Sequence, residues 1–294
     1  MILLSLLAFI IIFSTLILAH EFGHFFAAIK SGVKVEEFAL GMGKNLWKRK
    51  KGGTEYTINA VPFGGFVRML GEEESSGDPR SFCKAKLWKR MIITLAGITM
   101  NFLLAIVCLT LLFTVGTNPI LITEKDVEKA QEAGLVKLSA EKNADGKYDL
   151  LEIHPIQKPF PQSFFFAITE TGRISKAVVE KVVDIPMEII ETGHLPEGLT
   201  GPVGIAEVTH KVVPLGIMAL IKLLALLSIS IAVINLLPIP ALDGGRFLFQ
   251  LVELVTFHAP PKKWENAIHT TGYVLLMLLL VAITWNDVVR IFFS

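Results

Sequence analysis

Cysteine is nearly absent from this 294-residue chain, which has only Cys83 and Cys108. Two thiols cannot form a disulfide framework or a thiolate zinc cluster, so any metal site must use histidine and carboxylate ligands. A large excess of either charge is also missing, because 28 basic residues nearly balance 27 acidic ones and leave a net charge of +1. A nucleic-acid-binding protein concentrates basic charge on one face, so we expect no nucleic-acid partner.

The first nineteen residues carry no charge, and they lack the basic start and small-residue cleavage site of a signal peptide. We therefore expect this segment to be retained. The chain is 52% hydrophobic, which is too apolar for an ordinary soluble domain. An apolar helix needs about 20 residues to cross a hydrocarbon core of about 30 Å. Four segments qualify, and they predict four transmembrane helices over residues 1–29, 91–115, 223–242 and 267–285.

The two long segments between these helices differ in charge. Residues 30–90 hold 13 Lys or Arg and 7 acidic residues, a net charge of +6, whereas residues 118–210 hold 9 and 15, a net charge of −6. Basic loops stay on the cytoplasmic side of a membrane. We therefore predict a multi-pass topology in which the first segment is cytoplasmic and the second segment and both termini are extracytoplasmic.

The sequence TEYTINAVPFGGFVRML, over residues 54–70, alternates β-branched or aromatic residues around a Pro-Phe-Gly-Gly turn. This pattern predicts a small, membrane-associated β-hairpin in the first cytoplasmic loop. The expected fold is otherwise an all-α polytopic membrane protein. We divide it into the first half of the membrane core (1–115), a short extracytoplasmic segment (116–159), an extracytoplasmic amphipathic helical segment (160–211) and the second half of the core (212–294).

The sequence His20-Glu21-Phe22-Gly23-His24 places two imidazoles four residues apart, on one face of a helix and within reach of one metal ion. Glu21 could serve as the base for a metal-bound water. At a rise of 1.5 Å per residue, a helix that leaves the membrane near Lys30 puts His20 about 15 Å inside. Ionised groups at such depth are costly unless they are paired or coordinated, so we interpret these residues as a metal site.

A catalytic zinc ion needs a third protein ligand and an open position for water. Asp243 is the only acidic residue between Glu207 and Glu253, and the sequence around it, NLLPIPALDGG, predicts that the helix breaks there. Broken helices within a membrane are tolerated where they line a cavity. Taken alone, Asp243 could equally be an ion-pair partner of Arg246. Together with the two histidines, it is the candidate third ligand.

Four motifs in order, HEFGH, PFGGFVRM, GPVGIA and NLLPIPALDGG, resemble the bacterial site-2 protease family. These intramembrane zinc metalloproteases of the bacterial inner membrane include the regulator of sigma-E protease. The resemblance implies Zn²⁺ held by His20, His24 and Asp243 toward the cytoplasmic side, with Glu21 activating water. It also implies substrate contacts by Asn235 and by a strand edge at Gly64 and Gly65.

The implied reaction is hydrolysis of peptide bonds within or near the transmembrane helix of single-span proteins, such as anti-sigma factors or signal-peptide remnants. Members of the family usually carry one or two PDZ domains in the outer loop. Residues 117–159 are too few to fold as such a domain, so we interpret them as a lost or vestigial PDZ domain. The expected partners are transmembrane substrates and the lipid bilayer, and the sequence does not define an oligomeric state.

Two other functions use the same residues: an inactive relative that binds helices without cutting them, and a metal transporter. An inactive relative is expected to lose Glu21 or a ligand, but this chain keeps all of them. A transporter is expected to place polar residues along several helices, whereas here they gather at one depth. The five other histidines lie outside any ligand spacing and are interpreted as surface or interfacial residues: His154, His194, His210, His258 and His269.

Overall fold

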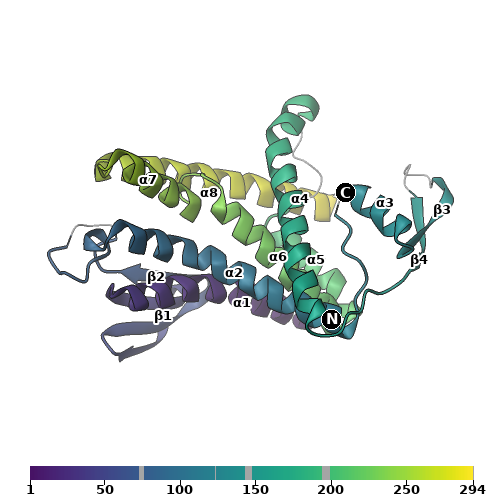
Figure 1. Ribbon diagram of the computed structural model, residues 1–294, viewed down its shortest axis with the longest axis horizontal. Helices are drawn as coiled ribbons and strands as arrows, with labels where there is room; N and C mark the ends of the chain where they lie inside the picture. The colour runs from purple at the N-terminus through teal and green to yellow at the C-terminus, as the bar shows by residue number, and fades with distance from the viewer. Residues whose placement is uncertain (73–75, 123, 143–147, 194–198, 294) are drawn as a thin grey trace.

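A computed structural model describes residues 1–72, 76–122, 124–142, 148–193 and 199–293. Its elements, in chain order, are α1 (Ile2–Ser31), β1 (Val35–Lys51), β2 (Thr54–Met69), the 3₁₀ helix η1 (Phe82–Lys84), α2 (Leu87–Val115), α3 (Glu124–Glu132), β3 (Val136–Lys142), β4 (Tyr148–Ile153), α4 (Gln162–Thr192), α5 (Pro202–Val212), the 3₁₀ helix η2 (Val213–Leu215), α6 (Ile217–Leu236), α7 (Asp243–Thr256) and α8 (Lys262–Phe293) (Figure 1). The protein is therefore mostly helical.

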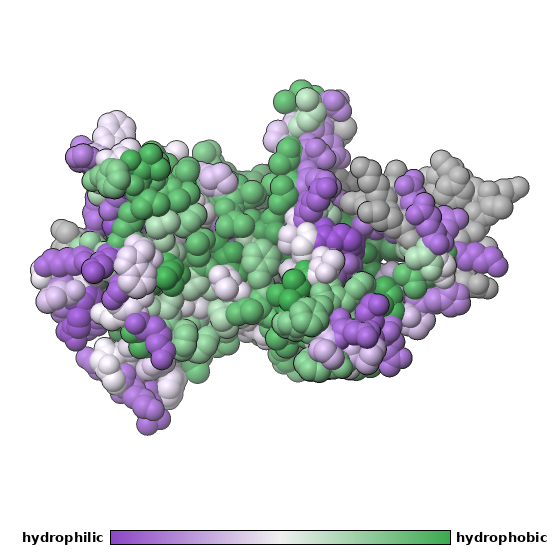
Figure 2. Space-filling view, in the orientation of Figure 1, coloured by the Kyte–Doolittle hydropathy of each residue, from purple (hydrophilic) through white to green (hydrophobic). Residues whose placement is uncertain are grey.

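Four of these helices are long and apolar enough to cross a membrane: α1, α2, α6 and α8. This confirms the four predicted spans. Figure 2 shows apolar residues over the middle of the molecule and polar residues toward its two ends, as expected for a bundle surrounded by lipid. Both chain termini lie at the end of the bundle that carries α3, β3 and β4, and the β1–β2 hairpin lies at the opposite end (Figure 1).

The centre of the bundle is the packing of α2 against α1 and α6. Small residues allow the helices to approach closely, which is typical of membrane interiors. Ala105 of α2 and Ala225 of α6 are fully buried. They belong to one apolar cluster with Leu109, Leu112, Phe113, Ile229 and Val233.

The β-hairpin is larger than predicted. β1 and β2 pair antiparallel and are joined at Gly52 and Gly53, which both have positive φ. The Pro-Phe-Gly-Gly sequence at 62–65 therefore lies within β2 and does not form the turn. The prediction was wrong on this point because the charged run before Gly52 is typical of a loop, although these residues complete β1.

The hairpin also bends over itself, so that the first part of β1 lies between the two ends of β2. Phe38, for example, pairs with both Val67 and Tyr56. The last part of β2, residues 65–69, is consequently an edge: among the described residues its strand partners all belong to β1. An edge of this kind has unpaired backbone groups available to another chain.

The third span ends earlier than predicted. α6 stops at Leu236, and a turn over residues 237–242 leads into α7, whose first residue is Asp243. α7 lies against α2 through a hydrogen bond of 2.8 Å from Gln250 Nε2 to Thr94 Oγ1. An ion pair of 2.5 Å between Arg90 and Glu253 joins the same two helices. The helix break therefore places Asp243 at the start of a helix that is fixed to the bundle.

The GPVGIA motif has a packing function. Asp287 of α8 is fully buried, and its Oδ2 atom accepts hydrogen bonds of 2.9 Å from the backbone N–H groups of Gly201 and Gly204. A carboxylate at a helix N-terminus satisfies free N–H groups and the helix dipole. A Cβ atom at either glycine would lie only 3.0 Å from an oxygen of Asp287. The glycines thus allow α8 to cap α5.

Candidate metal centre

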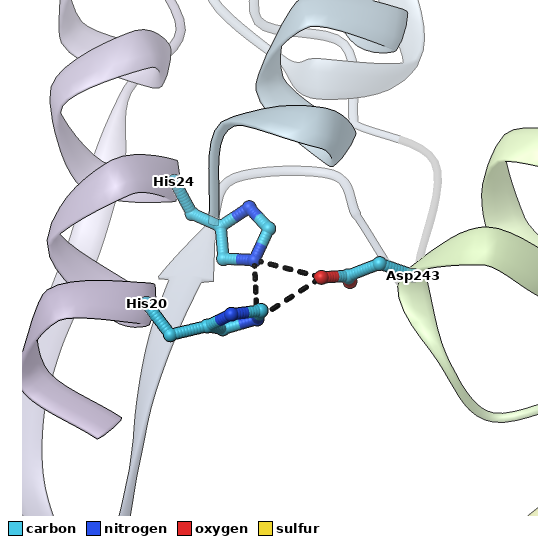
Figure 3. A group of neighbouring side chains, drawn as sticks. All are labelled: His20, His24 and Asp243. Atoms are coloured by element: carbon cyan, nitrogen blue, oxygen red, sulfur yellow. Dashed lines mark hydrogen bonds and ion pairs between the residues drawn. The ribbon is translucent and has the colours of Figure 1, made fainter. Parts of the chain in front are cut away.

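Two histidines of α1 lie one helical turn apart and point into the same space. The Nε2 atoms of His20 and His24 are 3.1 Å apart. Asp243 approaches them from the start of α7, with its Oδ2 atom 3.0 Å from Nε2 of His20 and 3.2 Å from Nε2 of His24 (Figure 3). The three atoms form a nearly equilateral triangle.

The size of this triangle suits a zinc ion. Tetrahedral zinc with bonds of about 2.0–2.1 Å to nitrogen or oxygen separates neighbouring ligand atoms by about 3.3 Å. Asp243 Oδ2 is buried, and although the imidazole nitrogens are close to it, no hydrogen bond to this oxygen is formed within the described residues. A buried carboxylate oxygen in that state is costly without a cation. The three residues therefore fit zinc.

The backbone of α2 orients His24. Its Nδ1 atom lies 2.8 Å from the carbonyl oxygen of Ile93. A carbonyl only accepts hydrogen bonds, so Nδ1 carries the proton and Nε2 keeps its lone pair free. This is the tautomer that a metal ligand requires, and a backbone carbonyl is a common partner of metal-binding histidines.

Asn101 of α2 has the corresponding position beside His20. Its side-chain amide nitrogen lies 3.3 Å from Nδ1 of His20, and its Oδ1 atom is buried without a partner among the described residues. The two ends of an amide have nearly the same shape. With the amide turned, Oδ1 accepts the Nδ1 proton of His20, which leaves Nε2 free for a metal.

Gly97 is the residue of α2 that leaves room for the imidazoles. A Cβ atom at this position would collide with Nε2 of His24 and would lie 2.8 Å from Nε2 of His20. On α1, Gly23, which directly precedes His24, allows a similar approach to the backbone of Ala96. The contact between α1 and α2 therefore depends on glycine at the depth of the candidate ligands.

Glu21 lines two cavities beside the candidate ligands, a larger one with all three of them and a smaller one with His20 and Asp243. The larger cavity has a volume of about 940 Å³ and is bounded by His20, Glu21, His24 and Asp243 on one side. Residues 66–72, from the end of β2 onward, form part of its wall. The edge of the β-hairpin and the candidate metal site thus face the same cavity.

Arg246 and Glu72 line the larger cavity and form an ion pair. Burial lowers the pKa of Arg246, but the nearby Glu72 carboxylate outweighs this effect and holds the pKa above its usual value. Arg246 is therefore charged, and its partner is Glu72 and not Asp243. The Oδ2 atom of Asp243 faces the two histidines.

The smaller cavity, of about 310 Å³, brings together the remaining predicted site residues. Gly64, Gly65 and Asn235 line it with Glu21. Gly65 lies directly on α1, because a Cβ atom there would be 3.0 Å from Cγ2 of Ile17 and 3.6 Å from Cγ of Glu21. The absence of a side chain at Gly65 therefore lets its backbone lie close to Glu21, the candidate base.

The candidate site residues all lie within a segment that resembles a known protein family. Residues 8–279, nearly the whole chain, match the family described as peptidase family M50. The chain belongs to this peptidase family. A Clostridium perfringens protein with a provisional zinc metalloprotease name is 34% identical over 94% of this chain and 96% of its own length.

Two Bacillus relatives in the same family carry more specific names. The regulator of sigma-W protease RasP of Bacillus subtilis is 28% identical over 98% of this chain and 99% of its own length. The zinc metalloprotease RasP of Bacillus licheniformis is 27% identical over the same shares. The first alignment spans 417 positions, more than the 294 residues of this chain, so that relative has residues without a counterpart here.

Several residues around the site of this M50 family member were not predicted from the sequence. Gly97, Asn101 and the Ile93 carbonyl act through the packing of α2 on α1, which residue spacing does not reveal. Of the five histidines interpreted as surface or interfacial, His269 is partly buried and accepts a hydrogen bond from the turn before Asp243. His210 lies 2.8 Å from Ser5 Oγ, and His194 lies outside the described residues.

Proposed function

We propose that this protein is an intramembrane zinc metalloprotease that cleaves peptide bonds within or near the transmembrane helix of single-span membrane proteins. The observation that carries the proposal is the convergence of His20, His24 and Asp243 beside Glu21. His20, Glu21 and His24 belong to α1, which is long and apolar enough to cross a membrane, and Asp243 joins them from the start of α7. Family membership and the names of the relatives support the chemistry.

When bound, zinc would polarise the attacking water and the scissile carbonyl. The other parts of the reaction belong to the chain. Glu21 accepts a proton from the attacking water and returns it to the leaving amine, as general acid–base catalysis requires. His24 and His20 are held as neutral ligands by the Ile93 carbonyl and Asn101.

The strand edge at residues 65–69 supports a mode of substrate binding. A transmembrane helix hides its amides in internal hydrogen bonds, so it must unwind before it is cut. An unwound segment can then pair with an exposed strand edge. We assign this function to the end of β2, with Gly64, Gly65 and Asn235 positioning the substrate next to Glu21 in the smaller cavity.

The proposal is tested with purified protein in lipid nanodiscs and a panel of labelled single-span helices. We expect cleavage inside or near the span that stops on addition of a zinc chelator and resumes on addition of zinc. A protein that binds zinc and these helices without cutting any of them would instead match the inactive relative, and zinc transport in sealed vesicles would match the transporter.

The topology makes a separate prediction for the orientation of the site. We propose an inner-membrane protein with both termini extracytoplasmic and the β1–β2 hairpin cytoplasmic, because of the charges of the two loops. In a background without Cys83 and Cys108, Lys50→Cys should be shielded from an impermeant thiol reagent in intact cells. Gln131→Cys should react. Both positions are exposed, so the reverse pattern would invert the topology.

The outer segment makes a prediction about substrate size. Residues 116–159 contain α3, β3 and β4, which we propose are a vestigial PDZ domain that excludes little. Replacing residues 128–150 with a short Gly-Ser linker keeps Asp126, which pairs with Arg173 of α4. We expect the cleavage rate to change less than about twofold for one helix carrying outer domains of increasing size. A sharp size limit that disappears in this variant would identify the segment as the filter.

A further inference from the structure

The turn that delivers Asp243 contains a residue in an unfavourable backbone conformation. Ala241 has a φ of +75°, in the left-handed region that residues other than glycine rarely adopt. It lies two residues before Asp243 and lines both cavities of the site. A conformation of this kind persists only where the surroundings enforce it.

The turn at Ala241 lies against α8, a helix that contributes none of the three candidate ligands. The backbone N–H of Ala241 donates a hydrogen bond of 2.9 Å to Nδ1 of His269. One turn further along α8, Gly272 lies against the same turn: a Cβ atom there would be 2.8 Å from the carbonyl carbon and oxygen of Pro240. Residues three apart share a helix face, so one face of α8 receives the turn.

The imidazole of His269 is itself fixed in place. Its ring lies 5.5 Å from the ring of Phe249 in α7, between centroids. Its Nδ1 atom accepts a hydrogen bond, so in this state the ring is neutral and carries its proton on Nε2. Nε2 is buried and has no partner within the part of the chain that the structure describes. The bond to Ala241 is thus the interaction that specifies the ring orientation.

We propose that His269 is a positioning residue for the metal site: it holds Ala241 in the left-handed conformation and thereby presents Asp243 to His20 and His24. The proposal rests on the zinc site proposed above. His269 touches neither the metal ligands nor the substrate edge, and it acts through two residues of backbone. Its loss should therefore weaken metal binding while leaving all three ligands and Glu21 in the chain.

The experiment compares variants that separate the hydrogen bond from packing. His269→Leu fills the space without an acceptor, whereas His269→Asn places an amide oxygen near the position of Nδ1. Thr270→Leu, at an exposed neighbouring position of α8, is the matched control. Zinc affinity of the full-length protein is measured by competition with a chromogenic chelator. The absorption spectrum of the cobalt-loaded protein reports ligand geometry, and thermal unfolding of the metal-free protein reports folding.

We expect His269→Leu to lower zinc affinity about 10- to 100-fold, as is usual when a residue that supports metal ligands is lost. His269→Asn and Thr270→Leu should bind nearly as tightly as the wild type. Adding Ala241→Gly to His269→Leu should restore part of the affinity, because glycine adopts positive φ without strain. That rescue would not occur if His269 only filled space.

Wild-type affinity in a folded His269→Leu variant would overturn the proposal. So would equal losses in the leucine and asparagine variants, or the absence of rescue by glycine at 241. If His269→Leu does not fold, the asparagine variant and Ala241→Gly in the wild-type background decide the question through their affinities and cobalt spectra. Failure of the wild type to bind one zinc would remove the zinc site itself, and this proposal with it.

Discussion

Glu21→Gln should abolish cleavage while the protein keeps its zinc. The amide cannot accept the proton of the attacking water, and loss of a general base lowers the rate about 10²- to 10⁴-fold. Glu21 is not among the three convergent candidate ligands, so one zinc per chain should remain. The measurement is the single-turnover cleavage rate of a labelled transmembrane helix, together with metal content by mass spectrometry.

The comparison variant for Glu21→Gln is His24→Ala. It should lose both activity and tightly bound zinc, since one of the three candidate protein ligands is gone. A Glu21→Gln protein that cuts at nearly the wild-type rate would exclude Glu21 as the base. Loss of zinc from Glu21→Gln would show instead that this carboxylate is a ligand.

Gly97→Ala should disrupt the metal site without changing a ligand. The added methyl group would collide with Nε2 of His24 and crowd Nε2 of His20, where their lone pairs converge. Because neighbouring backbones in a packed bundle move little, the imidazoles must turn away. We expect zinc affinity to fall at least about 10-fold, with a matching loss of cleavage, as measured by chelator competition.

Gly172→Ala is the matched control for Gly97→Ala. Gly172 is also within a helix, α4, but a Cβ atom there would meet nothing within 4 Å. This variant should bind zinc as the wild type does and should be no less stable, because alanine favours the helix more than glycine. Unchanged zinc affinity in a folded Gly97→Ala variant would mean that the imidazoles have room that the structure does not show.

The sequence was a good guide wherever one helix or one residue type decided the outcome. Long apolar runs predict spans, and the four-residue spacing of His20 and His24 requires only a helix to bring the imidazoles together. Asp243 stood out because no other acidic residue lies near it in the sequence. The assignment of these residues as ligands remains a prediction until metal binding is measured.

Features that depend on contacts between distant segments could not be predicted in this way. The charged run in β1 indicated a loop, yet its pairing with β2 makes it a strand. The functions of Gly97 and Asn101 arise because α2 crosses α1 at their depth. His269 has no motif around it, and its importance follows from the turn at Ala241 that lies against it.

During synthesis, His20 and His24 leave the ribosome early, and Asp243 follows only after α6 has been made. A nascent chain that ends before α7 therefore carries two imidazoles but lacks the carboxylate of the third candidate ligand. Because the three candidate ligands are divided between the two ends of the sequence, the site can be completed only after most of the chain has been made.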